Sequence, residues 1–345
     1  MTYTYNIHDI VKIESDVMLL NSVFHRYFLS SDVSDPDLII KIEKDIHVSK
    51  QGLSRQDLWF YGKEGEDFIY YEDKLFGMKD KVLVKNIKSK PTEIHATKSV
   101  LKINRRSRGS LFDLIEAIID LKLLESGYLT IHAACLSKNN SAILLAAFPN
   151  IGKTLSTLYL LKSGFKYLYD DTGFIDYKGN AYSRPSTSGI HYADFLKFIT
   201  HDDIGLWNYY ISILKAISNK VAGKIFGPPT LDLLSIKGYE STKKSRVDIA
   251  CCLEIGEKKI KQVKKEEFIR KILAINDYSR PRITQNPFMQ VYAYFNNIDF
   301  AEINEMEKRI LRGFLTHCKC FILSCNKRDW GEIIKEVYER NAKTE

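Results

Sequence analysis

The chain has 345 residues, of which 45% are hydrophobic and 27% are charged. This composition excludes an intrinsically disordered protein, and the length predicts two domains or one large α/β unit. The net charge of +8 suits an anionic ligand, but the basic cluster over residues 98–108 is more typical of a solvated loop than of a nucleic-acid patch, so we expect no nucleic-acid partner.

The apolar segments and the cysteine spacing favour a location in the reducing cytoplasm. The first residues lack the basic, apolar and small-residue regions of a secretory signal, and no apolar run approaches the roughly 20 residues that span a bilayer. The six cysteines lack the paired spacing of a zinc site, which favours free and mostly buried thiols. We therefore expect a cytoplasmic protein without membrane contact.

The first hundred residues are predicted to be rich in β-strands. Short apolar or alternating runs, separated by turn residues, occur at 38–44, 58–62, 68–71 and 82–87. The apolar spacing becomes helical over 111–124, with Ser110 in the N-cap position and Gly127 closing the segment. We place a domain boundary just before this helix, which gives a β-rich domain over 1–108 and an α/β domain over 109–345.

Strands and helices alternate in the second predicted domain. One strand is expected over 129–135, and the next, over 141–146, is apolar on both faces and therefore central in a sheet. A helix from Lys153 to Ser163 and a strand over 165–169 follow. Later strands are predicted at 247–255 and 320–325, and later helices at 206–221, 265–275, 302–317 and 330–341.

The most informative segment lies between the strand at 141–146 and the helix at Lys153. It reads Ala147-Phe148-Pro149-Asn150-Ile151-Gly152-Lys153-Thr154 and fits a phosphate loop of the G-x4-G-K-[ST] type. In such a loop, backbone N–H groups bind phosphate, Lys153 reaches the β- and γ-phosphates, and the Thr154 hydroxyl ligates Mg²⁺. Ala147 replaces the first glycine, so we expect Asn150 to take the left-handed conformation.

Titratable residues flank this loop in the sequence. Asp170 and Asp171 end the next strand, where one carboxylate could hold Mg²⁺ while the other accepts a proton from an attacking hydroxyl. His132 lies on the preceding strand, and the sequence supports a core histidine and a site histidine equally. Three arginines are candidates for stabilising charge on a transferring phosphoryl group, although surface positions are favoured for each: Arg184, Arg280 and Arg282.

Several of these segments together resemble the catalytic domain of HPr kinase/phosphorylase and of the related serine kinases. The segments are Ile131-His-Ala-Ala-Cys, Ala142-Ile-Leu-Leu-Ala, Gly152-Lys-Thr and Lys162-Ser-Gly-Phe-Lys-Tyr-Leu-Tyr-Asp-Asp. The resemblance implies an α/β P-loop kinase domain similar to phosphoenolpyruvate carboxykinase, with ATP as phosphoryl donor. It further implies a hydroxyl acceptor, which could belong to a peptide, a protein or a small molecule.

The resemblance also implies a role for each matching residue. Lys153 and the backbone near Gly152 would bind phosphate, Thr154 and Asp171 would bind Mg²⁺, Asp170 would be the catalytic base, and His132 would lie beside the transferring phosphoryl group. A Leu-Glu-Ile-Arg-Gly segment of the family is missing after the aspartate pair, which favours the related kinases over HPr kinase/phosphorylase itself.

Two other functions stay open. Asp170-Asp-Thr-Gly173 fits the D-x-x-G pattern of a GTPase and Asn326-Lys-Arg-Asp329 fits N-K-x-D, but one helix and one strand after Lys153 leave no room for a switch segment. Alternatively, Ala147 marks a nucleotide-binding regulatory protein that transfers no phosphate. The β-rich domain could hold a peptide, cap the kinase domain or make contacts in a homo-oligomer.

Overall fold

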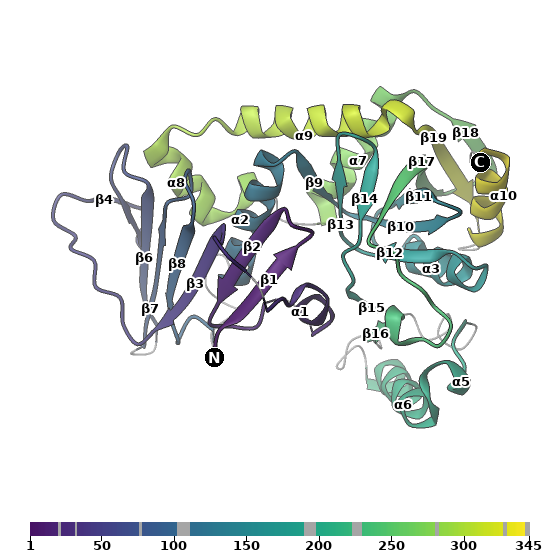
Figure 1. The fold of residues 1–345 in the computed structure, drawn as a ribbon, viewed down its shortest axis with the longest axis horizontal. Coiled ribbons are helices and arrows are strands. Elements are labelled where there is room, and N and C mark those ends of the chain that lie inside the picture. The colour runs from purple at the N-terminus through teal and green to yellow at the C-terminus, as the bar shows by residue number, and fades with distance from the viewer. Residues whose placement is uncertain are drawn as a thin grey trace. The chain divides into compact units, whose positions relative to one another are not determined.

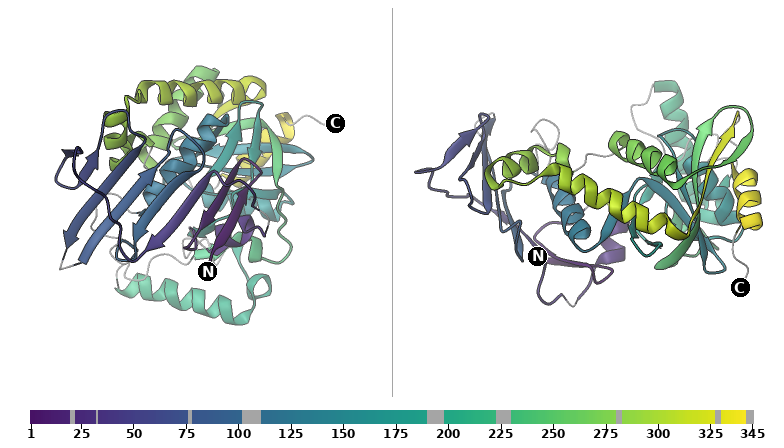
Figure 2. Two further views of the ribbon diagram at one scale, coloured as in Figure 1. Left: turned by 60° about the vertical axis from the view of Figure 1, so that its left-hand side comes forward. Right: turned by 90° about the horizontal axis from the view of Figure 1, so that it is seen from above.

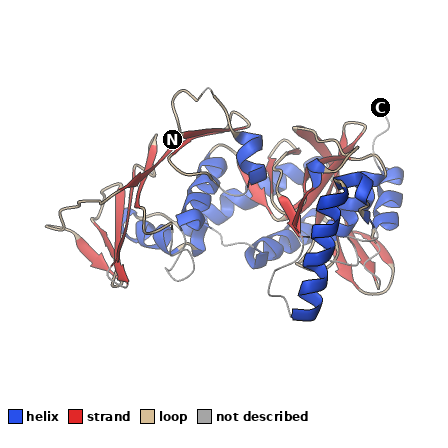
Figure 3. Cartoon of the chain, turned by 90° about the horizontal axis from the view of Figure 1, so that it is seen from below, coloured by secondary structure: helices blue, strands red, loops and turns tan. Residues whose placement is uncertain are grey.

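The computed structural model describes residues 1–19, 22–31, 33–75, 78–101, 111–189, 198–222, 230–279, 283–326 and 330–341. The chain divides into two compact units: Met1–Gly127 with Pro281–Glu307, and Tyr128–Arg280 with Lys308–Glu345. Helices and strands occur in both units, so the fold class is mixed α/β with several sheets (Figure 3). Within the described ranges, no helix has both the length and the apolar character needed to cross a bilayer.

The first unit is built on a sheet for which eight strands are described, in the order β1-β2-β3-β8-β7-β6-β5-β4. Their bounds are β1 (Tyr3–Ile7), β2 (Val11–Ser15), β3 (Leu38–Glu43), β4 (Ser54–Gln56), β5 (Phe60–Gly62), β6 (Phe68–Leu75), β7 (Met78–Lys85) and β8 (Thr92–Thr97). The predicted strands at 38–44, 58–62, 68–71 and 82–87 are confirmed as β3, β5, β6 and β7 in whole or in part. Sequence reasoning did not find β1, β2, β4 or β8.

Helices cover one face of this sheet (Figure 1). The unit contains α1 (Ser22–Phe28), α2 (Leu111–Glu125), the 3-10 turn η2 (Ile283–Gln285), α8 (Pro287–Asn296) and the start of α9 (Phe300–Phe314). Alternate residues of β2 and β8 are buried, as expected for a sheet with one covered face. The Phe295 ring of α8 packs so closely on Gly62 of β5 that a Cβ there would lie 2.5 Å from it. The helix predicted at 111–124 is confirmed as α2, while Ser110 lies outside the described residues.

The second unit is built on a larger sheet, whose described strands follow the order β12-β10-β11-β17-β14-β13-β9, with β19 beside β17 and β18 beside β19. Its strands are β9 (Tyr128–Ile131), β10 (Ala133–Lys138), β11 (Ser141–Ala146), β12 (Lys166–Tyr169), β13 (Gly173–Asp176), β14 (Asn180–Tyr182), β17 (Lys244–Ile255), β18 (Lys259–Gln262) and β19 (Lys319–Cys325). A separate pair consists of β15 (Thr187–Gly189) and β16 (Thr230–Asp232). All six cysteines of the chain are free and buried in this unit, as predicted.

Helices lie on both faces of the larger sheet (Figure 2). The helices of this unit are α3 (Lys153–Lys162), α5 (His201–Ile204), α6 (Leu206–Ala222), the 3-10 turns η1 (Leu233–Ser235) and η3 (Leu315–His317), α7 (Lys265–Ser279), α10 (Gly331–Asn341) and the end of α9, of which α5 and α6 lie beyond β15 and β16 and away from the sheet (Figure 1). The core on one face joins α3 and α10 to Leu145 of β11 and Cys251 of β17. Residues alternate along a strand, so Cys252 and Glu254 face the opposite side, where Lys271 of α7 pairs with Glu254.

The strand at 141–146 is central, as its composition predicted. Every residue of β11 is buried, and the strand pairs with β10 in antiparallel and with β17 in parallel orientation. The later predicted helices and strands are also present with shifts of a few residues at their ends. An example is α7, which continues to Ser279 rather than ending at Ile275.

The single strand predicted over 129–135 is wrong. The structure has two strands, β9 and β10, separated at His132. β9 pairs with β13 in one part of the sheet, whereas β10 pairs with β11 and β12 in another. The break has a physical cause, because the His132 backbone N–H donates to the Asn276 side-chain oxygen at 2.8 Å instead of to a neighbouring strand.

Candidate active site

The directions of the strands bring the predicted site segments to one edge of the larger sheet. β11 and β12 are each antiparallel to β10, and β17 is parallel to β11. The chain therefore leaves β11, β12 and β17 at the same edge, and it enters β10 there. The loop at 147–152, the Asp170-Asp171 pair and His132 meet at this edge for that reason.

The loop after β11 has the backbone of a tight turn into a helix. Positive φ angles occur at Asn150 (66°) and Gly152 (122°), which confirms the left-handed conformation predicted for Asn150. Gly152 is the N-cap of α3 and provides no side-chain cap for the first N–H groups of the helix. Those N–H groups have no carbonyl partner within the helix, so they are available to an anion.

Trp330, immediately before α10, is hydrogen-bonded to the loop. Its indole is fully buried, and its Nε1–H donates to the Ile151 carbonyl at 3.0 Å. Ser156 donates from its hydroxyl to the Gly152 carbonyl at 3.1 Å. These two bonds restrain both halves of the turn.

Lys153, His132 and Asp171 form a row at the first turn of α3. Lys153 Nζ lies 2.6 Å from His132 Nε2, and His132 Nδ1 lies 3.3 Å from Asp171 Oδ1. A protonated lysine only donates, so Nε2 accepts and the imidazole is neutral with its proton on Nδ1, directed at Asp171. The structure thus places His132 between Lys153 and Asp171 and not in the apolar core.

Burial controls the charges in this row. Only 8% of His132 is exposed, and burial, together with the positive charge of Lys153, lowers the pKa of His132 to about 4, although Asp171 opposes the change. Burial also lowers the pKa of Lys153, against the opposing charges of Asp171 and Asp170. A bound phosphate would add negative charge beside Lys153 and favour its protonated form.

The two aspartates differ sharply in environment. The Asp171 side chain is 62% exposed. Asp170 is almost completely buried and accepts a hydrogen bond from the Thr157 hydroxyl at 2.5 Å. Burial raises the pKa of Asp170, while the Thr157 hydrogen bond and the charge of Lys153 oppose the rise, and the Thr154 hydroxyl acts in the same direction as Thr157.

Three residues at this edge were missed by sequence reasoning. Thr157 lies one helical turn after Lys153, so the i, i+4 spacing could have revealed it once the helix was predicted. Asn276 and Trp330 carry no such signal, because their contacts with His132 and Ile151 join segments that are far apart in the sequence.

The other predicted candidates are described only in part. The Arg184 backbone N–H donates to the Leu168 carbonyl of β12 at 3.1 Å, and its guanidinium is stacked over the Phe174 ring at 5.4 Å. Arg280 and Arg282 lie outside the described residues. Asn326 follows β19 and is exposed, but Asp329 is outside the described residues, so the N-K-x-D pattern stays a prediction.

The oxygen donors at this edge fit a magnesium ion bound together with a nucleotide. Within the described residues, no group of three His, Cys, Asp or Glu side chains forms a metal cage. Mg²⁺ does not need such a cage, because it commonly uses one or two carboxylates, phosphate oxygens and water. The exposed Asp171 carboxylate and the Thr154 hydroxyl are donors of this kind.

No protein-family model matches the chain, and a search of curated proteins finds no match either. Among solved structures, the Hpr(Ser) kinase/phosphatase from Coxiella burnetii is similar, with 11% identity and a TM-score of 0.28 over 61% of this chain and 94% of that chain. A TM-score this low does not establish a shared fold.

Proposed function

We propose that this protein is a kinase that binds a nucleoside triphosphate with Mg²⁺ and transfers the γ-phosphoryl group to a hydroxyl acceptor. The observation that carries the proposal is the meeting of Lys153, His132 and both aspartates around the uncapped first turn of α3. A buried lysine at a helix N-terminus supplies the positive charge and the N–H donors that phosphate requires.

In this proposal, residues 147–154 bind the phosphates, and Lys153 neutralises charge on the β- and γ-phosphates. Thr154 and Asp171 hold Mg²⁺, which neutralises further negative charge on the phosphates when it is bound. His132 keeps the Lys153 ammonium directed at the transferred group. The acceptor oxygen forms its bond to the γ-phosphorus as the bond to the leaving diphosphate oxygen breaks.

Asp170 receives the proton of the acceptor hydroxyl. Its environment supports this role, because burial raises the pKa of Asp170 toward the working pH, where a carboxylate accepts a proton most effectively. The exposed Asp171 is better suited to a hydrated cation. The acceptor belongs to the class of peptide, protein or small-molecule alcohols.

The proposal is tested by calorimetry with MgATP on the wild type, on Lys153→Ala and on a matched control, Lys162→Ala. Lys162 is an exposed lysine in the last turn of the same helix. We expect Lys153→Ala to abolish binding and Lys162→Ala to leave it unchanged. Equal affinity of wild type and Lys153→Ala would reject the phosphate site.

Phosphoryl transfer to a panel of peptide and small alcohols is then compared between the wild type and Asp170→Asn. We expect a loss of about 10²–10⁴-fold in transfer, the usual contribution of a general base, with the affinity for MgATP retained. Tight binding by the wild type without any transfer would instead support the regulatory nucleotide-binding protein.

A further inference from the structure

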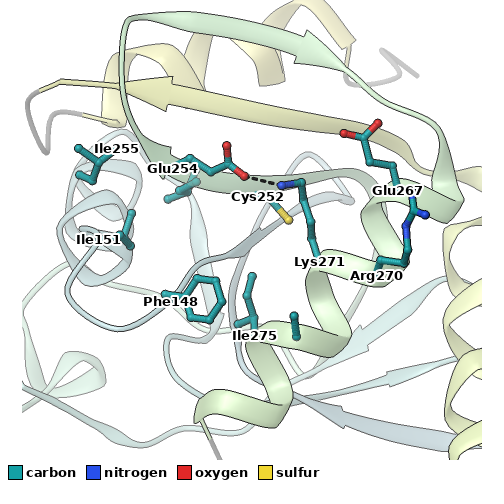
Figure 4. Close-up of a pocket in the computed structure, with 11 residues that line it drawn as sticks. Phe148, Ile151, Cys252, Glu254, Ile255, Glu267, Arg270, Lys271 and Ile275 are labelled. Carbon is teal, nitrogen blue, oxygen red and sulfur yellow. Dashed lines mark hydrogen bonds and ion pairs between the residues drawn. The ribbon is translucent and has the colours of Figure 1, made fainter.

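A cavity of about 660 Å³ opens directly beside the phosphate loop (Figure 4). Two loop residues, Phe148 and Ile151, form one wall, and residues 252–255 at the end of β17 form another. Helix α7 completes the lining with Arg270, Lys271 and Ile275 among others. This volume falls within the range of about 300–1,000 Å³ that is usual for small-molecule sites.

The position of the cavity indicates which part of a ligand it holds. β17 neighbours β11 on one side, whereas β12, which ends at Asp170 and Asp171, lies beyond β10 on the other side. A ligand whose phosphates occupy the loop therefore has the aspartates at one end and the cavity at the other. The transferred group must lie near the aspartates, so the cavity is left for the nucleoside end.

The chemistry of the lining fits a flat group with polar edges. Phe148 is 43% exposed and, with Ile151, Ile255 and Ile275, provides apolar surface. Glu254 and Lys271 are joined at 2.6 Å above Phe148 and Ile275 (Figure 4), so a carboxylate acceptor and an ammonium donor lie side by side.

The charges of the lining balance. Arg270 and Lys271 are matched in number by Glu254 and Glu267, which disfavours a second phosphate group in the cavity. A heteroaromatic base presents neighbouring donors and acceptors on its edge and apolar faces above and below. The two rings of a purine cover more of this apolar lining than the single ring of a pyrimidine.

We propose that the cavity lined by Phe148, Ile151, Glu254, Lys271 and Ile275 binds the purine base of the nucleoside triphosphate. This inference rests on the proposed function, since it assigns the other end of the same ligand. A substitution at Ala274 tests the base site separately from the phosphate site. Ala274 is exposed on α7 and lines the cavity, so a larger side chain there would fill the space for the base.

The test measures the affinities of ATP, GTP, CTP and inorganic tripolyphosphate by calorimetry with Mg²⁺. We expect ATP or GTP to bind at least 10-fold more tightly than tripolyphosphate and CTP. We expect Ala274→Phe to remove that preference while tripolyphosphate affinity stays within about two-fold of the wild type. Lys153→Ala should weaken all four ligands, which tests the phosphate site separately.

Two results would overturn the inference and leave the phosphate site intact. One is CTP or tripolyphosphate binding as tightly as both purine nucleotides. The other is an unchanged purine preference in Ala274→Phe. If Ala274→Phe does not fold, the same affinities are measured for Lys271→Met, for which we expect a 10-fold loss of the purine preference. An unchanged preference in Lys271→Met would then overturn the inference. Lys335→Met, which alters another lysine paired with a carboxylate but on α10, should retain the preference.

Discussion

Lys153 Nζ lies 2.6 Å from His132 Nε2, and the two side chains reach this contact from segments on either side of β10 and β11. The contact keeps the imidazole neutral, because a protonated imidazole would have no lone pair for the ammonium and would place two positive charges together. Lys153 is therefore positioned by a group whose own protonation would release it.

This relationship predicts that acid destabilises the protein through His132. The pKa of His132 in the folded chain is about 4, below its ordinary value of 6.5, so between these values the unfolded chain binds more protons. The stabilising contribution is complete above pH 6.5 and is lost as the pH falls toward 4. We expect chemical unfolding from pH 7.5 to 4.5 to show a steeper loss of stability in the wild type than in His132→Gln. Parallel profiles would contradict the assignment of a neutral buried imidazole.

Thr157 is expected to position Asp170 and to tune its protonation. Its hydroxyl donates to Asp170 and lowers the pKa of that carboxyl, so Thr157→Val should raise the pKa and move the acidic limb of the pH–rate profile to higher pH. Loss of the hydroxyl that holds the carboxylate in place should also lower the transfer rate, because a misplaced base accepts the proton less effectively. Thr157→Ser retains the hydroxyl and should preserve the profile. A lower rate with an unshifted limb would indicate a packing role alone.

The extent to which the site could be predicted follows from how local each feature is. The loop, Lys153 and the aspartate pair were identified because a strand, a turn and a helix in immediate succession define them. The left-handed Asn150 followed from Ala147 in the same turn. In contrast, the break at His132 depends on Asn276, which lies 144 residues later, and no local pattern encodes that contact. The cavity beside the loop was missed for the same reason, since α7 completes it.

Asn276 is expected to stabilise the fold by accepting a hydrogen bond from the buried His132 backbone N–H. The asparagine is 6% exposed, and Asn276→Ala would leave a buried N–H without its acceptor. We expect the free energy of unfolding to fall by about 1–3 kcal/mol in urea titrations. Asn208→Ala removes an exposed amide bonded to the Ile204 carbonyl and should change stability by less than about 0.5 kcal/mol. Equal effects of the two substitutions would show that the buried bond contributes little.

Gly173 is expected to be intolerant of even one added carbon. A Cβ at this position would lie 2.1 Å from the ring of Tyr169, which is fully buried and directly precedes Asp170. Gly173→Ala should therefore displace the ring and lower stability by about 1–3 kcal/mol in thermal unfolding. Gly256→Ala is the matched control, because its nearest neighbour would lie at 3.8 Å, an ordinary contact. A neutral Gly173→Ala would mean that the ring moves freely.

The bond between Trp330 and the Ile151 carbonyl has a spectroscopic consequence. The chain contains three tryptophans, and the loop-bound Trp330 is fully buried whereas Trp207 on α6 is 78% exposed. In a Trp59→Phe variant, which removes the third and partly buried tryptophan, aqueous acrylamide should quench Trp207 and spare Trp330, so the shielded emission reports on the hydrogen bond to the loop. Any ligand that rearranges the Ile151 peptide should change this emission, which gives the loop at 147–152 an intrinsic optical probe.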